Sequence, residues 1–122
     1  MLVYIKEAHA IDSRSPNFGG PVVEDPVTTD ERYGVASKCV VDLGLDMIPA
    51  VIDKIDNKVG EAYQGWPDRL YLVGLDGKLR YAGERGPRGF RPDQLEAAIK
   101  KTLAEKATPD AAGEPAKKTR KL

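Results

Sequence analysis

The sequence is poor in cysteine and histidine and has no excess of charge of either sign. Its single cysteine, Cys39, excludes an internal disulfide, a CxxC redox pair and any site built from several thiolates. One histidine and one cysteine cannot form a zinc site, and the carboxylates show no EF-hand spacing. The 19 Lys and Arg balance the 19 Asp and Glu, which argues against nucleic-acid or anionic-membrane binding. A lone free thiol fits a reducing compartment, so we expect a cytoplasmic protein.

Long apolar runs are absent as well. No stretch approaches the roughly 20 residues that a membrane-spanning helix requires, and the first residues lack the features of a signal peptide. The 122 residues, 41% hydrophobic and 31% charged, suffice for one small folded domain. We assign this domain to residues 1–106. The Ala-, Pro-, Thr- and charge-rich composition of residues 107–122 predicts a disordered tail.

The apolar pattern predicts alternating strands and helices. Strands are expected at residues 1–6, 48–52, 69–75 and 78–82, and helices at about 29–43, after Asp53, and from Pro92 onward. Thr28 and Glu31 have the spacing of a capping box, and Asp76-Gly77 is a strong hairpin signal. A long loop, at residues 8–29, separates the first strand from the first helix, and loops of such length are usually functional or disordered.

This order of elements predicts a mixed sheet. A helical crossover makes the first two strands parallel, and the hairpin makes the last two antiparallel. Four strands with helices on both faces form an α/β, thioredoxin-like arrangement. The chain begins directly in an apolar strand, so either this strand is a sheet edge or the first β-α unit of the fold is missing.

Three segments resemble the iodothyronine deiodinase family. Residues 3–9 (VYIKEAH), followed by Asp12, are similar to its "YIEEAH…D" segment. Residues 63–72 (YQGWPDRLYL) are similar to its "YGAxPERLYVI" segment, and residues 83–90 (GERGPRGF) to its "GGxGPxGY" loop. They occur in the family's order over about residues 2 to 103.

The resemblance implies a thioredoxin-like oxidoreductase that removes iodine reductively from iodinated phenols such as thyroxine. Its nucleophile is a selenocysteine, or a cysteine in some relatives, in a motif that nothing in this chain matches. We therefore expect a truncated selenoprotein or thiol enzyme whose nucleophile is encoded upstream of Met1, either by an in-frame UGA codon misread as a stop or by a cysteine codon. No cofactor is expected to be bound, and a thiol reductant, thioredoxin or glutathione, would regenerate the nucleophile.

Glu7 and His9 are the expected catalytic residues. Two residues apart at the end of a strand, they share a face if the extended conformation continues, and a histidine beside a carboxylate is a suitable proton donor. From the residues alone, a single histidine is more often a surface residue. The resemblance implies that this pair lines the active site and that His9 contacts the substrate.

Arg85 and Pro67 are further site residues. The resemblance implies that Arg85, in the Gly-Pro loop, binds polar groups of the substrate, although Glu84 replaces a neutral residue and competes for its charge. Pro67 occupies the place where thioredoxin folds carry a cis-proline; the alternative is a helix breaker. Trp66 is expected in the core or at the wall of an aromatic pocket. Cys39, on the apolar face of a helix, is interpreted as a structural thiol with a raised pKa.

Two other functions fit the same residues. The first is a general thiol peroxidase or disulfide reductase of the redoxin class, which activity on hydrogen peroxide rather than on iodophenols would reveal. The second is a non-catalytic redoxin-like scaffold, for which no thiol or UGA codon would lie upstream. Because a missing strand and helix would expose apolar sheet, we also expect self-association, for example a homodimer formed through residues 1–6.

Overall fold

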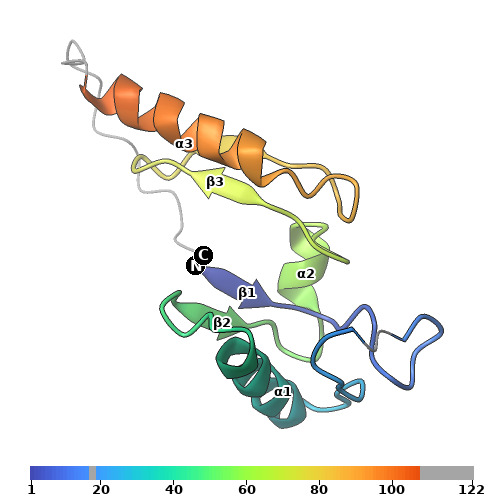
Figure 1. Cartoon of the computed structure of the whole chain (residues 1–122). Helices are drawn as coiled ribbons and strands as arrows, with labels where there is room; N and C mark the ends of the chain where they lie inside the picture. The colour runs from blue at the N-terminus through green and yellow to red at the C-terminus, as the bar shows by residue number, and fades with distance from the viewer. Residues whose placement is uncertain (17–18, 108–122) are drawn as a thin grey trace. The chain divides into compact units, whose positions relative to one another are not determined.

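A computed structural model describes residues 1–16 and 19–107 of the chain. These residues form two compact units, of which the first ends at Pro67 and the second begins at Asp68. The elements follow the order expected from the sequence (Figure 1): β1 (Leu2–Tyr4), α1 (Thr29–Asp42), β2 (Ala50–Ile52), α2 (Lys58–Ala62), β3 (Tyr71–Val73), β4 (Leu79–Ala82) and α3 (Pro92–Ala107). The tail expected at residues 107–122 lies outside the described residues, except for Ala107 at the end of α3.

The strands form two two-stranded sheets, one in each unit, where we predicted one sheet of four. β1 and β2 are parallel, with Val3 opposite Val51, and β3 and β4 are antiparallel, with Leu72 opposite Tyr81. Both directions agree with the prediction. The coarser α/β class is therefore confirmed, and the four-stranded sheet stays a prediction.

In the first unit, α1 connects β1 to β2 and packs beside β2 (Figure 1). The Thr28 hydroxyl caps α1 by accepting a hydrogen bond from the Glu31 amide at 3.1 Å, as the sequence predicts. The Glu31 carboxylate accepts from the amide of Val27 at 2.8 Å, one residue earlier than in a standard capping box. Gly44 ends the helix with a φ of 65°, a conformation that glycine adopts without strain.

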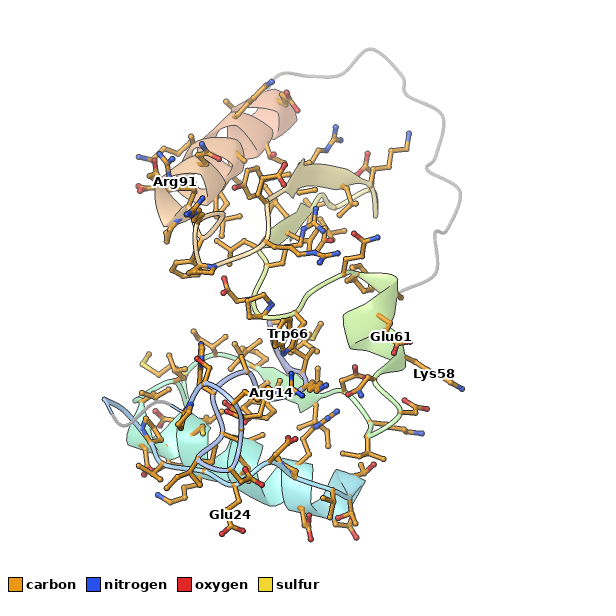
Figure 2. All side chains as sticks on the ribbon, turned by 90° about the vertical axis from the view of Figure 1, so that its right-hand side faces the viewer. Arg14, Glu24, Lys58, Glu61, Trp66 and Arg91 are labelled. Carbon is orange, nitrogen blue, oxygen red and sulfur yellow. The ribbon has the colours of Figure 1, made fainter. Side chains whose placement is uncertain are left out.

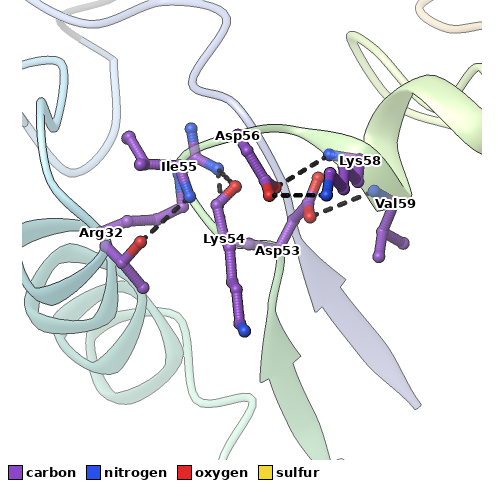
Figure 3. Close-up of polar contacts among 8 residues, drawn as sticks. Arg32, Asp53, Lys54, Ile55, Asp56, Lys58 and Val59 are labelled. Atoms are coloured by element: carbon purple, nitrogen blue, oxygen red, sulfur yellow. Dashed lines mark hydrogen bonds and ion pairs between the residues drawn. The ribbon is translucent and has the colours of Figure 1, made fainter.

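The interior of the first unit contains a polar cluster (Figure 3). Arg32 of α1 and Asp53, just after β2, are each only 2% exposed. The Arg32 guanidinium donates to the carbonyl oxygens of Asp53 at 3.1 Å and Lys54 at 2.8 Å, and to Asn57 Oδ1 at 2.9 Å. This brace joins α1 to the segment that leads from β2 into α2.

The Asp53 carboxylate supports the start of α2. It accepts hydrogen bonds from the amides of Val59 at 3.2 Å and Gly60 at 2.7 Å, so Asp53 caps the start of α2, although Asn57 is the residue that directly precedes the helix. Lys58 and Glu61 of α2 are exposed and point outward (Figure 2). Gly60 of this short helix lies against Ile5, whose Cβ is 3.6 Å from the position that a Cβ on Gly60 would take.

In the second unit, α3 packs against both strands of the β3–β4 hairpin. The turn is wider than the two residues expected: it spans residues 74–78, closed by a 2.8 Å bond from the Gly74 amide to the Lys78 carbonyl. Gly77 has a φ of 79° there, which explains the requirement for glycine. Pro92 is the first residue of α3, as predicted.

Candidate functional site

The two expected catalytic residues, Glu7 and His9, line a cavity of about 310 Å³ in the first unit. Four chemistry-bearing side chains line it: Tyr4, Glu7, His9 and Cys39. The rest of its wall is mainly apolar and comes from β1, the loop after it, and the second half of α1: Leu2, Pro21, Val23, Val40, Leu43 and Leu45. The local fold explains this set, because Leu2 and Tyr4 lie on one face of β1.

Tyr4 and Glu7 are bonded directly. The Tyr4 hydroxyl donates a hydrogen bond to Glu7 Oε2, across the turn that ends β1. Burial and then this bond raise the pKa of Tyr4 well above its usual value, so the phenol keeps its proton at neutral pH. The sequence did not single out Tyr4. The alternation of residues 2 and 4 was a usable signal, because it places both on the face that meets the helix.

Glu7 and His9 reach the cavity by a different route from the one predicted. β1 ends at Tyr4, so the extended conformation does not continue through the pair; the loop after the strand carries both residues to the cavity wall. Glu7 is half-buried and His9 is exposed. Their shared location agrees with the expected site, while their catalytic role stays a prediction.

The imidazole of His9 is oriented by the backbone. Its Nδ1 lies 2.8 Å from the carbonyl oxygen of Ser15. A carbonyl only accepts hydrogen bonds, so Nδ1 carries the proton and Nε2 is the nitrogen that can exchange one. This contact with the backbone keeps the proton of the neutral ring on Nδ1 and leaves Nε2 available for proton transfer.

Cys39 lies on the cavity wall, and its interpretation as a structural thiol stays a prediction. It is half-buried and lines the same cavity as Tyr4 and Glu7. Burial, followed by the negative charges of Glu7 and Asp42, raises the pKa of the Cys39 thiol, as the sequence predicts. At neutral pH the sulfur is therefore a neutral thiol rather than a nucleophilic thiolate.

Pro67 and Trp66 end the first unit. The Trp66–Pro67 peptide bond is cis, as the resemblance led us to expect; its place in an active site stays a prediction. Trp66, labelled in Figure 2, is 48% exposed rather than part of the core. Its side chain is not among those that line the cavity.

Arg85 belongs to the second unit, in the loop between β4 and α3. The loop is held by hydrogen bonds from the Gly86 amide to the Asp68 carbonyl and from the Gly89 amide to the Arg85 carbonyl, both 2.9 Å. A Cβ on Gly86 would overlap the Asp68 carboxylate, so a larger residue there requires the Asp68 side chain to move. The loop thus has a defined conformation, with Arg85 exposed on it.

The described part of the chain contains neither a cluster of metal ligands nor a membrane-spanning helix. Over residues 1–16 and 19–107, no group of three or more His, Cys, Asp or Glu side chains is placed to hold a metal ion. Within the same ranges, none of the helices has the length and apolar character needed to cross a membrane.

The sequence matches the iodothyronine deiodinase family over residues 1–103. It is 27% identical over 101 residues to a type I iodothyronine deiodinase from Xenopus laevis, covering 83% of this chain and 38% of the relative. It is 33% identical over 105 residues to a thyroxine 5-deiodinase from Aquarana catesbeiana, covering 78% of this chain and 34% of that protein. A thyroxine 5-deiodinase from Gallus gallus is 30% identical over 95 residues, with 78% and 36% covered.

The chain belongs to the iodothyronine deiodinase family. It spans about a third of the length of the curated relatives that it matches.

Proposed function

We propose that the chain is the part of a reductive deiodinase that supplies proton-handling and substrate-binding residues, and that the whole protein acts on iodinated phenols such as thyroxine. The observation that supports this most strongly is the cavity shared by Tyr4, Glu7 and His9, in a chain that belongs to this family. We further propose that the complete domain forms a thioredoxin-like sheet of four strands, extended by a β-α unit encoded upstream.

The reaction needs a nucleophile from outside this sequence. A selenolate or thiolate attacks the iodine of the aryl iodide, the carbon–iodine bond breaks, and the ring carbon takes a proton. The products are the deiodinated phenol and a selenenyl or sulfenyl iodide. An external thiol displaces iodide from it, forming a mixed disulfide or selenenyl sulfide and releasing H⁺. A second thiol, from thioredoxin or glutathione, restores the nucleophile and leaves as the oxidised disulfide.

Glu7 and His9 are proposed to supply the proton that the ring carbon receives. His9 is held through Nδ1 by the Ser15 carbonyl, so Nε2 transfers the proton, and Glu7 stabilises the charged imidazole. The Tyr4 hydroxyl fixes the Glu7 carboxylate. Arg85 is proposed to bind an anionic group of the substrate, for which a planar guanidinium is well suited. Reduced thiols are abundant in the cytoplasm, where we place the protein.

The test is a pair of assays on the full-length gene product, including any upstream sequence and its UGA or cysteine codon. We expect iodide release from thyroxine or from iodotyrosine with a thiol reductant, and little reduction of hydrogen peroxide. Rapid peroxide reduction without iodide release would favour the redoxin alternative. No thiol or UGA codon upstream, together with neither activity, would favour the non-catalytic scaffold.

A further inference from the structure

The cavity between β1 and α1 has the size of a site for a single ring. Its volume of about 310 Å³ lies at the lower end of the range for small-molecule sites, which runs from about 300 to 1,000 Å³. A ligand with two linked aromatic rings needs more room than one with a single ring. The cavity therefore favours a single substituted ring.

The chemistry of the wall is divided between polar groups and a sulfur atom. Tyr4, Glu7 and His9 offer hydrogen-bonding groups suited to a phenol hydroxyl. Apart from them, the lining is aliphatic, except for the thiol of Cys39. Sulfur is soft and polarizable, and it makes favourable contacts with other polarizable groups.

We propose that this cavity binds one halogenated phenol ring and that Cys39 determines its preference for iodine. The inference rests on the proposed function, because it takes the iodinated phenol from there. An aryl iodine is polarizable and electron-poor on the side opposite its bond to carbon. A thiol sulfur has lone pairs that complement that side of the iodine. A methyl group in place of the thiol has no lone pair and therefore makes no such contact.

The ionisation state of Cys39 is consistent with a binding role. Its pKa is raised, by burial first and then by Glu7 and Asp42, so the sulfur remains a protonated thiol at neutral pH. A protonated thiol contacts an iodine without displacing it, so Cys39 is assigned to a ring iodine other than the one that the nucleophile removes. Cys39 is thus a specificity residue rather than the nucleophile of the reaction.

The experiment measures ring binding by the 122-residue chain. Isothermal titration in mildly acidic buffer, where both phenols are neutral, compares 3,5-diiodophenol with 3,5-dimethylphenol, its near match in shape. We expect the iodinated ring to bind roughly three- to tenfold more tightly. Cys39→Ala is expected to abolish this preference, so that the two phenols bind the variant with equal affinity. Val41→Ala is the matched control, because Val41 lies on the same helix, is 71% exposed and does not line the cavity.

A second measurement does not depend on a variant. The rate at which iodoacetamide alkylates Cys39 should fall severalfold in saturating 3,5-diiodophenol, because the ring covers the sulfur. Circular dichroism establishes that each variant is folded, and Cys39→Ser, closer in shape, replaces Cys39→Ala if the latter unfolds.

Equal affinity for the two phenols, a preference for iodine that survives removal of the thiol, or unprotected alkylation would each overturn the proposal. Absence of binding by either phenol would also overturn it, and would indicate that another part of the protein or a second copy fills the cavity. These outcomes are separable from the proposed function, because iodide release by the full-length protein can persist when this chain binds no ring.

Discussion

The hydroxyl of Tyr4 donates a hydrogen bond to the carboxylate of Glu7, joining the last residue of β1 to the loop that follows it. Both side chains line the cavity that also holds His9. A phenol that keeps its proton is a reliable donor, and it directs the charge of Glu7 toward one position. The bond therefore organises the site before any substrate binds.

Tyr4→Phe should reveal the strength of this bond. Removing the hydroxyl leaves a half-buried carboxylate without this donor, and we expect the free energy of unfolding to fall by about 1–2 kcal/mol. Urea denaturation followed by circular dichroism measures the change. Tyr33→Phe is the control: this tyrosine is 64% exposed on α1, and its change should stay within about 0.5 kcal/mol. Equal effects of the two substitutions would contradict the assignment.

Stability should fall in alkaline solution. The pKa values of Tyr4 and Cys39 are both raised in the folded chain, so the unfolded chain loses these protons at lower pH than the folded chain does. Stability is then fully present below the unfolded pKa values, which are about 8.5 for cysteine and 10 for tyrosine, and declines as the pH rises above them. Urea midpoints measured from pH 8 to 11 should decrease, and less steeply in a Tyr4→Phe/Cys39→Ala double variant. A slope unchanged in the double variant would assign the decline to other groups.

The Arg32 brace should be essential for the first unit. Arg32→Met keeps the length of the side chain, but it leaves the carbonyl oxygens of Asp53 and Lys54 and the side-chain oxygen of Asn57 without the guanidinium donor. We expect a loss of at least about 3 kcal/mol in unfolding free energy, measured by chemical denaturation. Lys38→Met, which removes an exposed pair with Asp42 on the same helix, should change little. A brace variant as stable as this control would show that the cluster is incidental.

Gly86→Ala should disrupt the loop that carries Arg85. The added Cβ would overlap the Asp68 carboxylate, so the Asp68 side chain or the loop must shift, and we expect a cost of roughly 1–3 kcal/mol in thermal or chemical unfolding. Asp68→Ala in the same chain should restore much of it by removing the obstructing group. Gly34→Ala, in open space within α1, should instead stabilise by up to about 1 kcal/mol. No rescue by the Asp68 substitution would mean that the strain lies elsewhere.

The sequence predicted the local structure well because local signals determine it. The Thr28 cap and Pro92 at the start of α3 follow from side-chain chemistry within a few residues. The directions of the two strand pairs follow from their connections, a helical crossover and a hairpin. The buried brace was not predictable, since Arg32 and Asp53 lie 21 residues apart and their contact depends on how α1 crosses to β2. Only some of the residues that line the cavity could be predicted from the sequence. Glu7 and His9 were identified by resemblance, whereas the contribution of Cys39 depends on how the helix packs.

The most direct test of the proposed mechanism is the rate of iodide release by the full-length protein carrying His9→Asn, measured with thyroxine and excess thiol. Asparagine fills a similar position but cannot donate the proton. We predict a fall in kcat of roughly 10²- to 10⁴-fold with little change in KM, because His9 acts in the transition state through its Nε2. A variant that releases iodide at the full rate would contradict the assignment of the proton to the Glu7–His9 pair.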